Sequence, residues 1–220
     1  MIAQFHQSQY YPTCQYVLSA SDGTILGNAE IVEEGKKFIP SLTGNLDLNG
    51  KEYIIRYTMF HGFPIYSEGK QIGAIEQKST VKKTGFLKYE GYPYQMFTIN
   101  NETFELCEVG FGKDQHYFCL HRGGVTAAVV HVSDLEITFC NDYTIYGEDE
   151  NAVLAACMGI MYKEGVRYNN REDSNNASLP VDPSRKEITR TRVYNSLDPS
   201  LRARFDPNFI PRIQARDGQN

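Results

Sequence analysis

Few side chains in this sequence lie close enough together to suggest chemistry, and the nearest to a reactive pair is "CLH". Cys119 and His121 fall on one face of a predicted strand, about 7 Å apart by the rise of an extended chain. A thiol beside an imidazole could begin a nucleophilic pair or half of a metal site. Because no third ligand or orienting acid is near them in the sequence, we predict a structural role. We predict no catalytic residue, metal site or cofactor.

Two further motifs match functional sites only in part. The stretch "GFGKDQ", residues 110–115, lacks the spacing of a phosphate-binding loop, and no helix-forming stretch follows it. We therefore predict a hairpin turn there. The acidic residues Glu148, Asp149 and Glu150 directly precede an apolar segment. Negative charge is stabilising at a helix N-terminus, so we predict that they begin a helix rather than bind a metal.

The strongest candidate for a binding site is a cluster of lysines in "EQKSTVKKTGFLKYEG". Phe86 and Tyr89 add aromatic surface to it. On two strands and their connection, these lysines would form a basic patch for an anionic lipid head group or another polyanion. The alternative is a solvated hairpin whose lysines protect a sheet edge. The lysines are Lys78, Lys82, Lys83 and Lys88.

The charge balance divides the chain into two parts. The 220 residues carry a net charge of −5, but residues 1–164 have a net charge of −8 and residues 165–220 a net charge of +3. The basic residues of the first part are mostly lysines, whereas those of the second are nine arginines and one lysine. We therefore predict a domain over residues 1–165 and a separate C-terminal arm over residues 166–220.

The first part has the pattern of many short strands. In "KEYIIRYTMF", apolar residues at 53, 55, 57 and 59 alternate with residues that include Glu52 and Arg56. That period of two is typical of a strand with one buried face. Turn signals such as "SDGT", "NG", "SEGK", "NN" and "RGG" separate the runs at short intervals. About ten to twelve strands precede Gly147, which predicts a β-sandwich or a closed β-barrel.

One apolar segment near residue 155 decides between these two folds. Residues 152–161, "AVLAACMGIM", have no polar face, so a helix formed from them must be enclosed by lipid or by protein. About ten residues of helix span roughly 15 Å, half of a bilayer core, so protein must enclose it. We predict a closed antiparallel barrel of about 12 strands with a helix, over about residues 149–163, through its middle.

This order of strands followed by a hydrophobic helix resembles the tubby C-terminal-like superfamily. The likeness covers residues from about 15 to 165 and rests on hairpins of the "DGTILG" type and on "ITFCNDYTIYGEDENAVLAACMGIMYKEG". It is strongest to the bacterial LURP-one-related group, with phospholipid scramblases as further relatives. The resemblance implies a twelve-stranded barrel around a helix, and it bears more on the fold than on the function. The cysteine-rich and calcium-binding stretches of scramblases are not present in the sequence.

The C-terminal arm has a different composition, rich in Pro, Asn, Asp and Arg. Its apolar residues are spaced too widely for a core, so we predict an extended or disordered segment that docks on an acidic surface. That surface is its own barrel or a neighbouring subunit's, and the alternative is a flexible linker. The residues that we predict to make the contact are Arg192, Tyr194, Arg202, Arg204, Phe205 and Phe209.

These features favour a non-enzymatic binding module that recognises an anionic lipid head group or a protein partner. The alternatives are an enzyme whose pocket is assembled from distant residues, and a structural subunit connected by its arm. We expect a soluble, cytoplasmic protein with no transmembrane segment, although peripheral membrane contact is compatible with it. We expect no nucleic-acid partner, because the domain is acidic, and self-association through the arm is a further hypothesis.

Overall fold

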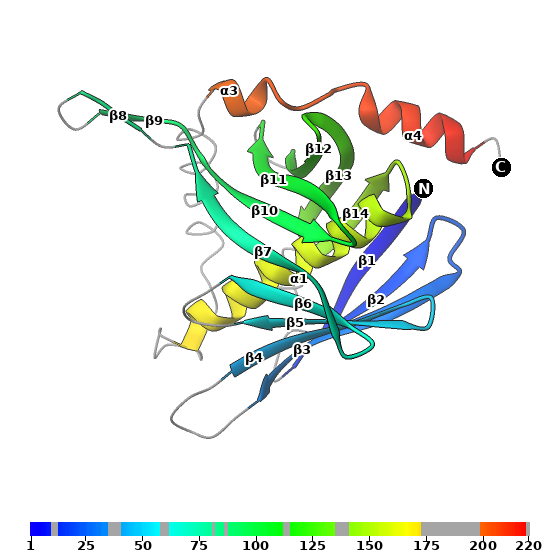
Figure 1. The fold of residues 1–220 in the computed structure, drawn as a ribbon. Coiled ribbons are helices and arrows are strands. Elements are labelled where there is room, and N and C mark those ends of the chain that lie inside the picture. The colour runs from blue at the N-terminus through cyan, green and yellow to red at the C-terminus, as the bar shows by residue number, and fades with distance from the viewer. Residues whose placement is uncertain are drawn as a thin grey trace.

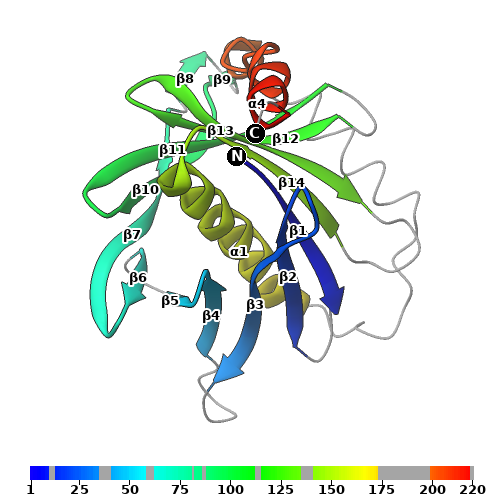
Figure 2. The same ribbon diagram turned by 90° about the vertical axis from the view of Figure 1, so that its right-hand side faces the viewer.

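Residues that alternate in polarity form the strands of a closed antiparallel barrel in the computed structural model (Figures 1 and 2). This confirms the predicted fold: a mainly β protein in which about 12 strands enclose a hydrophobic helix. The structure describes residues 1–9, 13–34, 41–57, 62–80, 82–85, 88–111, 115–134, 141–172 and 199–218.

The twelve barrel strands follow one another around the ring with one interruption. Between β7 and β10, which pair directly, the chain forms a separate hairpin of β8 (Lys82–Gly85) and β9 (Lys88–Glu90). The barrel closes where β1 pairs with β14, with Phe5 opposite Tyr143. The barrel strands are β1 (Ile2–Gln9), β2 (Cys14–Ala20), β3 (Ile25–Glu34), β4 (Ser41–Leu48), β5 (Lys51–Tyr57), β6 (Phe63–Ser67), β7 (Lys70–Ser79), β10 (Pro93–Ile99), β11 (Glu102–Gly110), β12 (His116–Arg122), β13 (Val125–Asp134) and β14 (Asn141–Gly147).

Tight turns join the strands at one end of the barrel. The "NG" pair connects β4 to β5 with positive φ angles of 53° at Asn49 and 75° at Gly50. Asn and Gly reach this backbone region at low energetic cost, which is why the pair favours a short hairpin loop. The "SEGK" turn between β6 and β7 has the same character, with φ of 51° at Glu68 and 74° at Gly69.

The apolar segment forms the first part of helix α1 (Glu150–Glu172), which runs through the barrel (Figure 2). Every residue from Ala152 to Met161 is buried. The helix is longer than the predicted 149–163, so the predicted boundary at Gly165 lies within it. Gly165 does not end the helix. A glycine is needed at this position because the ring of Tyr57 occupies the space of a side chain: a Cβ atom would lie 2.2 Å from that ring.

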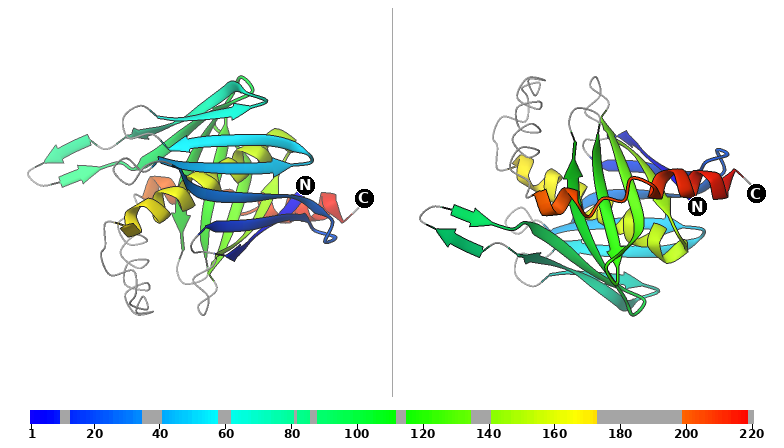
Figure 3. Two further views of the ribbon diagram at one scale, coloured as in Figure 1. Left: turned by 90° about the horizontal axis from the view of Figure 1, so that it is seen from below. Right: turned by 90° about the horizontal axis from the view of Figure 1, so that it is seen from above.

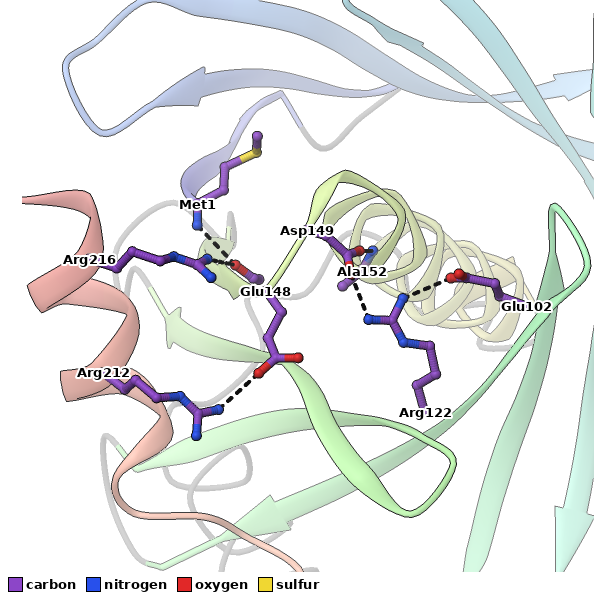
Figure 4. Close-up of polar contacts among 9 residues, drawn as sticks. Met1, Glu102, Arg122, Glu148, Asp149, Ala152, Arg212 and Arg216 are labelled. Atoms are coloured by element: carbon purple, nitrogen blue, oxygen red, sulfur yellow. Dashed lines mark hydrogen bonds and ion pairs between the residues drawn. The ribbon is translucent and has the colours of Figure 1, made fainter. Parts of the chain in front are cut away.

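Polar contacts fix the N-terminal end of α1, as the acidic cluster predicts. Asp149 Oδ1 accepts a hydrogen bond from the backbone N–H of Ala152 at 2.8 Å (Figure 4). The other carboxylate oxygen of Asp149 pairs with Arg122 at 2.6 Å, and Arg122 also pairs with Glu102 at 2.9 Å. A carboxylate in this place satisfies an N–H group without an intrahelical partner and complements the helix dipole.

The described residues 199–218 of the arm contain two short helices, α3 (Pro199–Arg202) and α4 (Phe209–Asp217), which lie along the outside of the barrel (Figure 3). This differs from the extended or disordered arm that we expected. A helix of nine residues is marginal by itself, and α4 is stabilised by burying Phe209 and Ile213 against the barrel wall. The remaining part of the arm, residues 173–198, lies outside the described residues.

Placing a charge at Gly159 should prevent folding. A Cβ atom there would lie 2.6 Å from Leu106 Cδ1 and 3.7 Å from Phe97, so Gly159→Glu would bury an unpaired carboxylate among apolar groups. Such burial costs several kcal/mol, comparable with a typical total stability of about 5–15 kcal/mol. We expect an insoluble or unfolded product by circular dichroism. Gln214→Glu, on an exposed position of α4, is the control and should melt like the wild type.

Candidate functional site

The predicted basic patch lies mainly on one projecting hairpin. Strands β8 and β9 extend away from the barrel (Figures 1 and 3), with Lys82 opposite Glu90 and Lys83 opposite Tyr89. Lys88 lies opposite Gly85 beside the connection between the two strands. The backbone therefore brings three of the four predicted lysines together, in a part of the molecule that stands apart from the barrel wall.

Lys78 lies at the base of this hairpin and has a partner. It is exposed near the end of β7, and its ammonium group is 2.5 Å from the carboxylate of Glu76. The hydrogen bond from Lys78 to Glu76 raises the pKa of the lysine, with their charge attraction as the second cause. The contribution of Lys78 to a polyanion site is thus partly neutralised, and the hairpin lysines are the stronger candidates.

The arm places an arginine over the outer face of β11 and β12. One guanidinium nitrogen of Arg204 is 2.6 Å from a carboxylate oxygen of Glu105, and another donates to the hydroxyl of Tyr92 at 2.9 Å and to Cys107 Sγ at 3.5 Å. The carbonyl oxygen of Arg204 accepts a hydrogen bond from His121 Nε2 at 3.0 Å. Arg204 is therefore held by both its side chain and its main chain.

Apolar residues on either side of Arg204 complete this contact. Leu201 is 1% exposed and packs in a cluster with Cys107, Val109 and Cys119. Phe205 packs against Tyr117, with ring centroids 4.9 Å apart. Further along, Phe209 packs on Val129 and is fully buried. These contacts show that the arm docks on its own barrel, which is one of the two surfaces that the sequence predicted.

Helix α4 is anchored next to the start of the barrel. Arg212 pairs with Glu148 at 3.0 Å, and Arg216 donates to the carbonyl oxygen of Gly147 at 3.0 Å (Figure 4). Asp217 accepts a hydrogen bond from the backbone N–H of Ile2 at 2.7 Å. The predicted match between a basic arm and an acidic barrel is thus realised by specific ion pairs.

The other residues that we predicted to make the contact are Arg202, Arg192 and Tyr194. Arg202 is exposed, with its guanidinium carbon 6.0 Å from the ring centroid of Phe111. Arg192 and Tyr194 lie outside the described residues. The sequence did not single out Ile213 or Arg216, although the spacing of Phe209 and Ile213 by four residues was a signal for one buried helix face.

The arm covers the thiol and the imidazole of "CLH". Burial raises the pKa of Cys107 to about 11 and also raises that of Cys119. A reactive cysteine needs a lowered pKa, so this environment is the opposite of an activated nucleophile. His121 uses Nε2 to bind the arm rather than a thiol, and burial lowers its pKa. The structural role predicted for these residues fits the geometry better than the enzyme alternative.

A buried polar cluster, not anticipated from the sequence, surrounds the second half of α1. The carboxylate of Glu164, 3% exposed, accepts hydrogen bonds from the hydroxyls of Tyr143 at 2.5 Å and Tyr16 at 3.3 Å. Asn141 donates to the same carboxylate at 3.0 Å, and Gln7 donates to Tyr16 at 3.1 Å. Burial and, next, the charge of Glu164 raise the pKa of Tyr16, so the phenol stays a donor and the cluster holds the helix in register.

The outer face of β1 to β5 has a shallow acidic depression of about 500 Å³. Its described lining includes the carboxylates of Glu30, Asp47 and Glu52 together with several amide side chains, and contains no lysine or arginine. Figures 1 and 2 both place β3 and β4 on the side of the barrel opposite the β8–β9 hairpin. The acidic depression and the lysine-bearing hairpin therefore lie on different sides of the molecule. Over the described part of the chain, no three acidic, histidine or cysteine side chains form a group that could hold a metal ion.

Comparisons with known proteins identify no similar protein. No family model, no curated protein and no solved structure matches the chain. The likeness to the tubby C-terminal-like superfamily therefore stays a prediction from the sequence pattern. Within the described ranges, no helix is both long enough and apolar enough to cross a membrane.

Acidification should destabilise the docked arm through His121. Because its pKa is lowered in the folded protein, the unfolded chain binds more protons once the pH falls below about 6.5. Stability is then lost as the pH falls from about 6.5 towards the folded pKa, by at most about 1.4 kcal/mol per pH unit. In His121→Gln, an amide donor replaces Nε2 and does not titrate. We expect a flatter stability profile between pH 7 and 5 in urea unfolding, and an unchanged profile would contradict the assignment.

Proposed function

We propose that the protein is a non-enzymatic binding module that docks on anionic lipid head groups through the β8–β9 hairpin. The observation that carries the proposal is the position of Lys82, Lys83 and Lys88 on one hairpin that projects from an otherwise acidic domain. Residues 78–90 contain four lysines and one glutamate, a net charge of +3 in a chain of −5. A lysine near an anionic membrane surface contributes about 1 kcal/mol to binding.

The position of the acidic depression, on the side of the barrel away from the hairpin, favours one orientation. Repulsion between an anionic surface and the acidic depression would be strong if β3 and β4 faced the membrane. With the hairpin facing it, these carboxylates are on the opposite side, and salt screens charges over about 8 Å at physiological ionic strength. The acidic body therefore steers the basic hairpin towards the lipid.

The sequence at the connection between β8 and β9 supports the same contact. Phe86 and Leu87 stand there between Gly85 and Lys88, so apolar residues are flanked by lysines on both sides. That pattern suits a peripheral anchor, in which apolar groups enter the head-group region and basic groups pair with phosphates. The sequence resemblance points the same way, because tubby proteins bind phosphoinositides through basic residues on neighbouring strands.

Neutralising two hairpin lysines should weaken binding to anionic vesicles. We expect Lys82→Gln/Lys83→Gln to lower the affinity for phosphatidylcholine vesicles that contain phosphatidylserine by about 30-fold, the equivalent of about 2 kcal/mol. Vesicle sedimentation at low and physiological salt measures it. Lys51→Gln/Lys70→Gln is the matched control, since both lysines are exposed at the tight-turn end and the net charge changes equally.

Two results would contradict the proposal. The first is binding of the wild type to pure phosphatidylcholine vesicles as strong as to the anionic ones, or no binding to either. The second is an equal loss of affinity in the two double variants, which would mean that net charge rather than the hairpin controls binding.

A further inference from the structure

Residues 201–205, "LRARF", form a short segment that is docked on the outer face of β11 and β12 through its side chains. Leu201 packs in an apolar cluster, Arg204 pairs with Glu105, and Phe205 packs on the ring of Tyr117. We call this receiving surface the arm groove and define it by five residues. They are Tyr92, Glu105, Cys107, Cys119 and His121.

The arm groove contacts both the side chain and the main chain of Arg204. Glu105 supplies a charge for the guanidinium of Arg204, and Tyr92 supplies a second acceptor. His121 binds the main-chain carbonyl of the same residue. The Arg204–Glu105 ion pair is partly buried, and Tyr92 binds the same guanidinium group, so a segment without this arginine would leave Glu105 and Tyr92 without their partner. The groove therefore favours a segment with an apolar residue three positions before an arginine.

The segment keeps its shape through its own hydrogen bonds. The N–H of Arg204 donates to the carbonyl of Leu201 at 3.1 Å, and the N–H of Phe205 donates to that of Arg202 at 3.1 Å. Its contacts with the groove come from side chains and from one carbonyl oxygen, so it adds no strand to the described barrel. Binding therefore does not depend on which chain supplies the segment.

We propose that the arm groove also accepts the arm of a second copy of the chain, so that two molecules exchange arms. The matching sequence is present in every copy, and the contacts made in cis and in trans are the same. Residues 1–164 carry a net charge of −8 and residues 165–220 one of +3, so the two parts of different copies attract each other. The 26 residues between Glu172 and Pro199 can span at most about 90 Å, enough to reach a neighbouring barrel.

The covalent connection makes a chain's own arm the stronger competitor. A tethered segment acts at a high effective concentration, which a second copy at micromolar concentration does not match. The exchange is therefore observable when the contact in cis is weakened and the contact in trans is kept. The Arg204–Glu105 ion pair offers that separation, because each partner is on a different side of the contact.

Two full-length variants with reversed charges test the exchange. In Arg204→Glu, the arm is repelled by its own groove, and in Glu105→Arg, the groove repels its own arm. Each variant alone should sediment as a monomer of 25.0 kDa. In an equimolar mixture, the native Arg204 of one chain meets the native Glu105 of the other, and the two substituted side chains form the reversed pair. We expect this mixture at micromolar concentration to sediment with twice the monomer mass, whereas the double variant Glu105→Arg/Arg204→Glu, matched in cis, stays monomeric.

The buried cysteines report arm docking separately from folding. Cys107 and Cys119 lie under the arm, whereas Cys14 and Cys157 lie in the barrel core. With a thiol reagent and mass spectrometry, we expect that of these four cysteines only Cys107 and Cys119 react in each single variant, and that they are protected again in the mixture. Reaction of Cys14 and Cys157 would show unfolding.

A synthetic peptide of residues 199–218 keeps the test decisive if the Glu105→Arg chain does not fold. It should bind the Arg204→Glu chain at least tenfold more tightly than the wild type, and the same peptide with Arg204→Glu should not bind. The proposal is overturned if Cys107 stays protected in the Arg204→Glu chain, or if this chain binds neither the Glu105→Arg chain nor the peptide. These measurements use no lipid, so their outcome is independent of the proposed function.

Discussion

Enclosure of one apolar helix is the constraint on which the rest of the structure depends. Helix α1 has no polar face between Ala152 and Met161, so twelve strands close around it and bury it from every side. Its position is then fixed by polar groups at both ends of the apolar segment. Asp149 binds Arg122 at one end, and Glu164 accepts hydrogen bonds from Tyr16 and Tyr143 at the other. The buried carboxylate of Glu164 is stable there because it has several hydrogen-bond donors, whereas that of Asp149 is partly exposed.

Filling the interior in this way moves recognition to the outside of the barrel. Two surfaces there have the composition of binding sites: the basic β8–β9 hairpin and the arm groove around Glu105. They use opposite charges, since the hairpin carries lysines and the groove holds an arginine against a carboxylate. The acidic depression that includes β3 and β4 occupies a further part of the barrel surface. This arrangement is consistent with one lipid-facing surface and one surface for the chain's own arm.

The sequence predicted the elements whose periodicity is local and did not predict contacts between distant residues. Alternation in "KEYIIRYTMF" and the ten apolar residues of α1 were sufficient for strands, helix and closed barrel. The predicted end of α1 was wrong because a glycine such as Gly165 often follows the last residue of a helix. The structure explains this glycine within the helix by the ring of Tyr57, which occupies the space of a side chain. The pairing of Arg204 with Glu105 joins residues 99 positions apart, and the cluster around Glu164 joins four elements. Such contacts have no spacing in the sequence that could reveal them.

The central claim is that the β8–β9 hairpin is the surface that meets anionic lipid. Amide hydrogen exchange, measured by mass spectrometry with and without vesicles that contain phosphatidylserine, tests it most directly. Our account predicts slower exchange in β8 and β9 with anionic vesicles, no change there with phosphatidylcholine alone, and no change in β3 and β4 with either. Unchanged exchange in the hairpin while the protein is vesicle-bound, or protection over the acidic face of β3 and β4 instead, would contradict it.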